Sequence, residues 1–160
     1  MSGKSPTIKI SDLSGAKAAI ISARWHSEIC DQLVAGATRA VKEANIQSID
    51  LHEVPGSFEL PLAAKLALTN GADFAVVLGV VLRGETPHFD YVCQGVTNGV
   101  MKVSLKLDKP IGFGVLTVDN IEQAIARSGA PGSKEDKGYD SAIAALELLR
   151  LKRQLSGRFA

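Results

Sequence analysis

The sequence predicts an α/β fold, a three-layer α/β/α sandwich around a central four-stranded parallel sheet. Apolar runs typical of strands alternate along the chain with segments in which apolar residues recur at helical spacing. The run at residues 74–82 is apolar throughout, as expected of a strand that helices cover on both faces. Alternating units form parallel sheets, and right-handed crossovers place the helices on both sides.

The first strand and helix are expected near the N-terminus. Residues 17–23 form a short apolar run that predicts a buried strand. A helix should follow, because apolar residues recur every four positions on one face. They are Ile29, Leu33, Ala37 and Val41. Residues 1–14 are polar and should form a loose N-terminal arm, or an added edge strand at 7–10.

The second unit begins with alternating polar and apolar residues. Residues 49–54 predict a strand that ends at the Pro-Gly breaker pair at 55–56. Ser57 should cap the next helix, and Pro61 falls in its first turn, where a missing N–H is harmless. The Asn-Gly pair at 70–71 is a typical helix end.

The third unit is the strand at 74–82 and the helix after it. Thr86 should supply a capping hydroxyl for this helix, with Pro87 at the first helical position. The helix should then bury one face. The residues of that face are Val92, Val96, Val100, Val103 and Leu107.

The last part of the chain predicts one more strand and two helices. Residues 111–118 have strand character, and Asp119 with Glu122 resembles a capping box for a short helix. Residues 128–137 are rich in Gly, Pro and charge and predict a loop. Residues 141–155 should form the final helix.

The composition excludes several classes of protein. A length of 160 residues suits a single domain over 1–160, and 46% hydrophobic residues suffice for a core. A net charge of +1 with interspersed signs argues against nucleic acid or membranes as partners. The N-terminal residues lack the apolar stretch of a secretory signal or membrane anchor. Cys30 and Cys93 form no CxxC pair, which fits a cytoplasmic, reducing compartment.

The loop at 83–88 is the richest candidate site, because such folds bind ligands at the carboxyl ends of strands. Free N–H groups at the helix start favour an anion, and Gly84 lets the backbone approach it. His88 can transfer protons near neutral pH. The alternative is a capped helix with a surface histidine. A nucleotide P-loop is disfavoured, because Glu85 stands where the phosphate-binding lysine belongs.

Other loops offer aromatic and charged candidates, each with a structural alternative. Trp25 can stack on a heterocycle, or it packs in a core or an interface. Glu59 can bind a ligand or favour a helix dipole. Arg127 favours the dipole at a helix end, or it completes a phosphate site. No His, Cys, Asp or Glu group has metal-ligand spacing, so no metal is expected.

The chain resembles the lumazine synthases over nearly its whole length. The blocks that carry the resemblance are VPGSFELP at 54–61, LGVVLRGETPHFDYVC at 78–93, FGVLT at 113–117, NIEQA at 120–124 and DKG at 136–138. The second block is long and highly specific. The resemblance implies the three-layer sandwich in its flavodoxin-like form.

The resemblance also implies a transferase reaction of riboflavin biosynthesis, without cofactor or metal. A ribitylamino-uracil condenses with 3,4-dihydroxy-2-butanone 4-phosphate, and phosphate and water are released. His88 is the implied catalytic residue. Those implied for the pyrimidine and ribityl chain are Trp25, Ser57, Phe58, Glu59, Val80, Val81, Leu82, Phe113 and Lys137. Those implied for the phosphate are Gly84, Glu85, Thr86 and Arg127.

The resemblance further implies a homopentamer in which Phe113, Arg127 and Lys137 come from the neighbouring subunit. Riboflavin synthase is a candidate downstream partner. The loop at 128–136 is longer than the corresponding turn of shell-forming relatives, which favours free pentamers over shells. One alternative is a catalytically silent flavin- or lumazine-binding relative, against which intact His88 and Arg127 argue. The other is a nucleotide-binding signalling domain, which would need a phosphate lysine or an acidic metal pocket.

Overall fold

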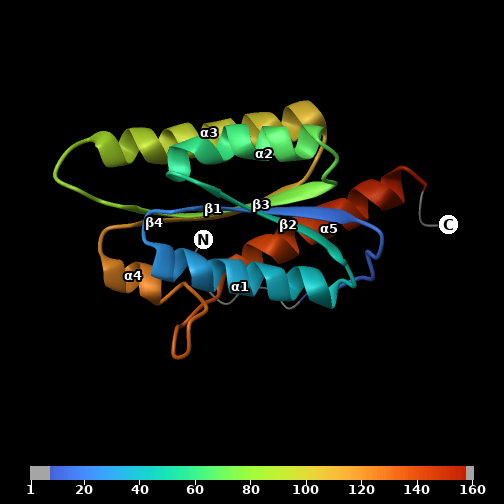
Figure 1. The fold of residues 1–160 in the computed structure, drawn as a ribbon, viewed down its shortest axis with the longest axis horizontal. Coiled ribbons are helices and arrows are strands. Elements are labelled where there is room, and N and C mark those ends of the chain that lie inside the picture. Colours follow the sequence, from blue (N-terminus) through green and yellow to red (C-terminus); the bar gives the residue numbers. More distant parts are fainter. Residues whose placement is uncertain (1–7, 158–160) are drawn as a thin grey trace.

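The computed structural model describes residues 8–157. Strands and helices alternate along the chain, as Figure 1 shows. In chain order the elements are β1 (Lys17–Ala23), α1 (Ser27–Glu43), β2 (Ser48–Val54), the 3-10 turn η1 (Ser57–Glu59), α2 (Leu60–Thr69), β3 (Phe74–Leu82), α3 (His88–Leu107), β4 (Ile111–Val118), α4 (Ile121–Ile125) and α5 (Lys137–Leu155). Within the described residues, no helix is long and apolar enough to cross a membrane.

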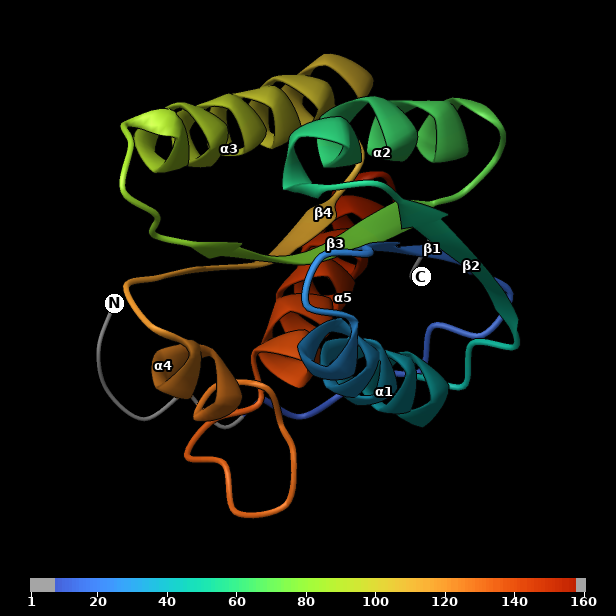
Figure 2. The ribbon, with the colours of Figure 1, turned by 60° about the vertical axis from the view of Figure 1, so that its left-hand side comes forward.

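The four strands form one parallel sheet in the order β2-β1-β3-β4. Helices α2 and α3 cover one face, and α1 and α5 cover the other (Figures 1 and 2). The predicted three-layer α/β/α fold is therefore confirmed. Because β2 lies on one side of β1 and β3 on the other, the chain reverses its winding direction between β1 and β3. Open α/β sheets bind ligands at this switch point.

The core has two parts, one on each face of the sheet. On β1, Ala18 and Ile20 pack toward α1 and α5, whereas Ala19 and Ile21 pack toward α2 and α3. This alternation follows from the two-residue period of a strand. Strand β3 is buried on both faces almost to its end, which explains its continuous apolar sequence.

Helices α1 and α5 come into close contact at Gly138. A side-chain carbon at this position would overlap the backbone carbonyl of Leu33 on α1. The missing side chain therefore lets the two backbones come into contact. The buried residues of α1 and α5 belong to one hydrophobic cluster on their face of the sheet.

The starts of α3 and α4 differ from the predictions by one residue. Pro87 occupies the position before α3, and no side chain of the described residues caps this helix, so the prediction of Thr86 as the cap with Pro87 at the first helical position is wrong. Asn120, rather than Asp119, caps α4, because its side-chain oxygen accepts from the Gln123 N–H at 3.0 Å. Both residue types are favoured at caps, so the sequence alone does not choose between these two neighbours.

Helix α5 begins at Lys137 rather than at residue 141. The Asp136 carboxylate caps it by accepting a hydrogen bond from the Tyr139 N–H at 2.8 Å. Lys137 therefore lies in the first turn of a helix and not in the preceding loop.

The N-terminal arm is described only in part. Residues 1–7 lie outside the described residues, and with them the first residue of the edge strand expected at 7–10. Residues 8–14 add no strand to the sheet. Leu13 is buried, and its N–H donates to the Ala44 carbonyl oxygen at 2.9 Å. This end of the arm is therefore packed against the end of α1 rather than loose.

Candidate active site

A cavity of about 760 Å³ opens at the carboxyl edge of the sheet, beside the switch point. The loops after β1, β2 and β3 surround it, together with the first turn of α3. The lining residues are Trp25, His26, Pro55, Gly56, Ser57, Phe58, Glu59, Val80, Val81, Leu82, Arg83, Gly84, Thr86, His88, Phe89, Tyr91 and Val92. One cavity thus brings together most of the site residues expected from the sequence.

The loop after β1 presents Trp25 to this cavity. Its indole is 70% exposed, so it does not lie in the core of this chain. The Cys30 thiol donates a hydrogen bond to the Trp25 carbonyl oxygen at 3.4 Å, and His26 has a left-handed φ of 57°. Such backbone strain in a non-glycine residue concentrates at functional loops. An exposed flat ring on an anchored loop can stack on a heterocycle.

Ser57 does not cap α2, contrary to the prediction. It opens η1, and its hydroxyl is buried without a hydrogen-bond partner among the described residues. The Glu59 carboxylate instead accepts from the Gly56 N–H at 2.9 Å. Gly79 on β3 makes room for the hydroxyl, since a Cβ there would lie 2.5 Å from the Ser57 Oγ. An unpaired buried hydroxyl in a cavity wall can bond a ligand.

Phe58 is the second aromatic residue of the cavity and is 60% exposed. Its ring lies against α3 at Gly95, where a Cβ would come within 2.6 Å of the Phe58 Cε2. The absence of a side chain at Gly95 therefore sets the position of the Phe58 ring.

Arg83 anchors the loop between β3 and α3. Its Nε donates to the Asp119 Oδ1 at 2.8 Å, its Nη1 lies 3.5 Å from the Asp90 Oδ1, and its guanidinium lies 4.1 Å from the centre of the Phe89 ring. The hydrogen bond to Asp119 raises the pKa of Arg83, which keeps the guanidinium charged. These contacts attach the start of the loop to the end of β4 and to α3.

Gly84, Thr86 and His88 follow Arg83 and line the cavity, whereas Glu85 does not. All are exposed. A Cβ at Gly84 would meet no atom within 4 Å, so the space around it is open. Backbone N–H groups at the start of α3 suit an anion, and the imidazole beside them can transfer protons.

Phe113, Arg127 and Lys137 lie outside the lining of this cavity. Phe113 is 40% exposed on the edge strand β4. The Arg127 Nη1 donates to the Gln123 carbonyl oxygen at 2.9 Å. The Lys137 Nζ lies 2.5 Å from the Glu135 Oε2, and this contact raises the pKa of Lys137. Within one chain, the structure does not join these three residues to the cavity.

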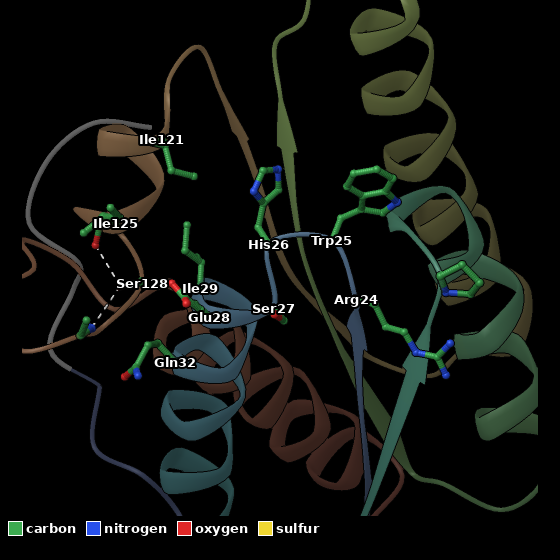
Figure 3. Close-up of a pocket in the computed structure, with 12 residues that line it drawn as sticks. Arg24, Trp25, His26, Ser27, Glu28, Ile29, Gln32, Ile121, Ile125 and Ser128 are labelled. Atoms are coloured by element: carbon green, nitrogen blue, oxygen red, sulfur yellow. Dashed lines mark hydrogen bonds between the residues drawn. The ribbon is translucent and has the colours of Figure 1, made fainter.

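A second cavity of about 760 Å³ shares Trp25, His26 and Pro55 with the first. Figure 3 shows Trp25 and His26 on the loop after β1, with Ile121 and Ile125 on α4. The loop after β1 therefore borders both cavities.

Sequence reasoning missed several lining residues. Tyr91 and Val92 had one signal, because they lie three and four positions after His88 on the same face of a helix. Arg83 was predicted only as part of the loop at 83–88, without a role of its own. Phe89 had no signal, since its position depends on its contact with Arg83. Within residues 8–157, no group of three or more His, Cys, Asp or Glu side chains is placed to hold a metal ion.

The fold and the cavity together define the class of protein. An open parallel sheet, an anion-suited loop and an imidazole meet at one carboxyl-edge cavity, next to an exposed indole. These are the features of an α/β enzyme that acts on small molecules.

Comparison with known proteins identifies the family. The family model of 6,7-dimethyl-8-ribityllumazine synthase matches residues 15–153. Proteins of that name are similar to this chain over nearly their full length. The one from Streptomyces coelicolor is 48% identical over 157 residues, which cover 98% of each chain. The one from Paenarthrobacter aurescens is 52% identical over 162 residues, which cover 98% of this chain and 100% of the relative. The chain belongs to the 6,7-dimethyl-8-ribityllumazine synthase family.

Proposed function

We propose that the protein makes 6,7-dimethyl-8-ribityllumazine in riboflavin biosynthesis. Its substrates are 5-amino-6-(D-ribitylamino)uracil and 3,4-dihydroxy-2-butanone 4-phosphate. The observation that carries the proposal is the single cavity that gathers Trp25, Ser57, Gly84 and His88 in a chain of this family. The protein is a transferase, and no cofactor is needed because the reacting amine and ketone are both supplied by the substrates.

The reaction is a condensation of two bound molecules. The 5-amino group attacks the ketone and forms an imine as water leaves. Carbon 3 of the sugar then loses a proton as phosphate departs from carbon 4, and the resulting enol tautomerises to a carbonyl at carbon 3. The ribitylamino nitrogen closes the ring on this carbonyl carbon, and a second water is lost. Proximity and orientation supply most of the acceleration in such a reaction. Because amine addition needs only modest proton transfer, one exposed imidazole suffices.

Each part of the cavity has a proposed role. Trp25 stacks on the pyrimidine, and residues 57–59 hold its polar edge and the ribityl chain. Residues 80–82 form the floor beneath the pyrimidine. Residues 84–86 bind the phosphate through the backbone at the start of α3, and His88 carries protons.

Incubation with both substrates tests the proposal directly. The product is fluorescent, so its formation can be followed continuously. Failure of the wild-type protein to form lumazine would refute the function. Binding of the pyrimidine without turnover would instead indicate a catalytically silent relative.

His88→Ala should slow turnover by roughly ten- to a thousandfold, within the usual range for acid–base help, without abolishing it. Some activity should remain because orientation and phosphate binding do not depend on the imidazole. Steady-state kinetics with saturating substrates measures the change. His52, which is exposed on β2 outside the cavity, gives the matched control His52→Ala with unchanged turnover. Turnover of His88→Ala at the wild-type rate would exclude it as the proton carrier.

Trp25 should report pyrimidine binding through its emission. It is the single tryptophan of the chain, and it is exposed beside the cavity. Stacking on the pyrimidine should quench or shift its fluorescence, whereas inorganic phosphate alone should change it little. An unchanged spectrum at saturating pyrimidine would rule out the stacking role.

We also propose that each active site is shared by two subunits of a homopentamer. Phe113, Arg127 and Lys137 supply the second side, which a neighbouring copy brings to the cavity. Exposed apolar residues on α2 and α3 support a subunit interface. They are Leu62, Leu66, Met101 and Leu105. Because one side of each subunit would meet the opposite side of the next, the contact is heterologous and either closes into a ring or grows as a filament. We propose a ring of five copies.

The loop at 128–136 favours free pentamers over closed shells. It extends away from the layers of the fold in Figure 2. A protruding loop would hinder packing of one pentamer on another. Mass measurement in solution tests this assembly: a monomer or dimer would refute the ring, and a megadalton particle would refute the free pentamer.

We further propose a domain organisation, a cellular compartment and a downstream partner for the enzyme. Residues 1–160 act as one domain, supported by the family match over 15–153. The enzyme works in the cytoplasm, whose reducing conditions suit the unpaired Cys30 and Cys93. Riboflavin synthase is the downstream partner that consumes the product.

A further inference from the structure

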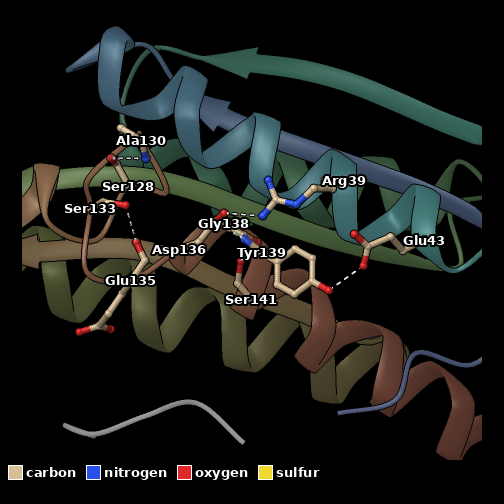
Figure 4. A network of polar contacts seen from close by, with 10 residues as sticks. All are labelled: Arg39, Glu43, Ser128, Ala130, Ser133, Glu135, Asp136, Gly138, Tyr139 and Ser141. Carbon is tan, nitrogen blue, oxygen red and sulfur yellow. Dashed lines mark hydrogen bonds and ion pairs between the residues drawn. The ribbon is translucent and has the colours of Figure 1, made fainter. Parts of the chain in front are cut away.

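The loop that carries Arg127 toward α5 is attached to α1 through one ion pair. The Arg39 Nη2 donates to the Asp136 Oδ2 at 2.7 Å, as Figure 4 shows. The same carboxylate caps α5 by accepting from the Tyr139 N–H. Asp136 therefore joins the end of the loop, the start of α5 and the middle of α1.

The Asp136 carboxylate occupies a slot between two glycines. A Cβ at Gly36 on α1 would overlap the carboxylate, and a Cβ at Gly129 would lie 2.5 Å from its carbon. Gly129 also has a φ of +81°, which other residues rarely adopt. The Asp136 side chain is only 21% exposed, although its partner Arg39 is 53% exposed. The neighbouring backbone is thus shaped to admit this carboxylate.

Arg39 is itself held by α5. Its guanidinium lies 4.9 Å from the centre of the Tyr139 ring, and the Tyr139 hydroxyl donates to the Glu43 Oε2 at 2.7 Å. Burial and then this hydrogen bond raise the pKa of Tyr139 to about 12. The Arg39 guanidinium is therefore held by two groups, the Asp136 carboxylate and the Tyr139 ring.

The backbone of Arg127 is fixed by the same segment. The Lys137 N–H donates to the Arg127 carbonyl oxygen at 3.0 Å. Ser128 forms a bridge with Asp136, and the Gly129 N–H donates to the Glu135 carbonyl oxygen at 3.1 Å. Movement of Asp136 would therefore move the main chain from which the Arg127 side chain extends.

We propose that Arg39 and Asp136 are positioning residues for the phosphate of the sugar substrate. They fix the main chain around Arg127, so that its guanidinium is aimed at the phosphate bound in the neighbouring subunit's cavity. This inference rests on the proposed function, in which Arg127 binds that phosphate. It assigns to α1 a role in substrate binding through a residue that lines neither cavity.

The test compares Arg39→Ala with the conservative Arg39→Lys and with Asp136→Asn, whose amide oxygen can still cap α5. Arg39→Ala should raise KM for the sugar phosphate by roughly three- to tenfold, a size typical of coupled neighbours. KM for the pyrimidine should stay within about twofold, because the Lys137 side chain, implied for that substrate, keeps its own ion pairs with Glu135 and Asp140. Asp136→Asn should resemble Arg39→Ala, and Arg39→Lys should recover part of the loss.

Arg150→Ala is the matched control. It removes another exposed arginine ion pair, with Glu147 at 3.2 Å on α5, and it does not contact the loop. Both KM values should stay at wild-type levels in this variant.

A double variant separates positioning from general destabilisation. In an Arg127→Ala background, Arg39→Ala should cause no further rise in the KM for the sugar phosphate, because the group that it positions is absent. An added rise there, or equal rises for both substrates in the single variant, would overturn the proposal.

Inorganic phosphate provides a readout without turnover. Calorimetry should show its Kd raised by Arg127→Ala and, by roughly three- to tenfold, by Arg39→Ala. If the wild-type protein forms no lumazine, the proposed function fails, but this binding series still decides the positioning role. A phosphate Kd unchanged in Arg39→Ala or in Arg127→Ala would overturn it.

Discussion

Gly138→Ala should lower the Tm by roughly 5–10 °C and reduce the yield of folded protein. The added methyl group would overlap the Leu33 carbonyl, so α5 and α1 would have to separate. Overpacking typically costs about 1–3 kcal/mol and more where backbone must move, and each kcal/mol shifts the Tm by about 2–4 °C at this chain length. Thermal unfolding followed by circular dichroism measures the shift.

Gly84→Ala is the control for this effect. A Cβ at Gly84 meets no atom within 4 Å, and its φ is not in the left-handed region. Its Tm should therefore stay within about 1 °C of the wild type, as for surface substitutions away from special features. Equal Tm values for Gly138→Ala and the wild type would show that the two helices can separate without loss.

Mixing two impaired variants should raise activity to about a quarter of the wild-type level if sites are shared around a ring, when the assay uses a sugar-phosphate concentration well below the KM of Arg127→Ala. Trp25→Ala and Arg127→Ala would each damage one side of every site. After unfolding and refolding together in equal amounts, half of the subunits keep Trp25 and half keep Arg127. With random neighbours, about a quarter of the sites combine both intact sides.

Each variant refolded alone is the control and should keep only its low residual activity. Mass spectrometry of differently labelled subunits must show that the assemblies are mixed. Mixed assemblies that are no more active than either parent would refute the shared site. Restored activity without subunit exchange would also contradict it, because no hybrid site would have formed.

The fold could be predicted because its elements differ strongly in apolar period. The continuous run at 74–82 had to be the central strand, and Ile29 to Val41 recurred at helical spacing. The helix starts were less accurate. Asp119 and Asn120 are both good caps, and in the structure Asp119 pairs with Arg83 while Asn120 caps α4. Such choices depend on tertiary contacts.

The part of the site that lies at the carboxyl ends of the strands could be predicted from the sequence. Because the carboxyl ends of neighbouring parallel strands meet at one edge, Trp25, Ser57 and His88 come together there. Residues that depend on side-chain direction could not be predicted. Gly79 leaves space for the hydroxyl of Ser57, which lies on another segment of the chain. No periodicity in the sequence predicts this contact. The roles of Phe113 and Arg127 stay predictions, because a neighbouring copy must bring them to the cavity.

The contact between Gly138 and Leu33 also affects how the chain folds during synthesis. It joins positions about a hundred residues apart, which makes it a late contact by loop-closure entropy. At roughly 5–20 residues per second, the ribosome needs about 5–20 s to make the intervening chain. During that time the apolar face of α1 has no α5 to cover it. Nascent chains are therefore most exposed to aggregation and chaperone binding until the last helix emerges.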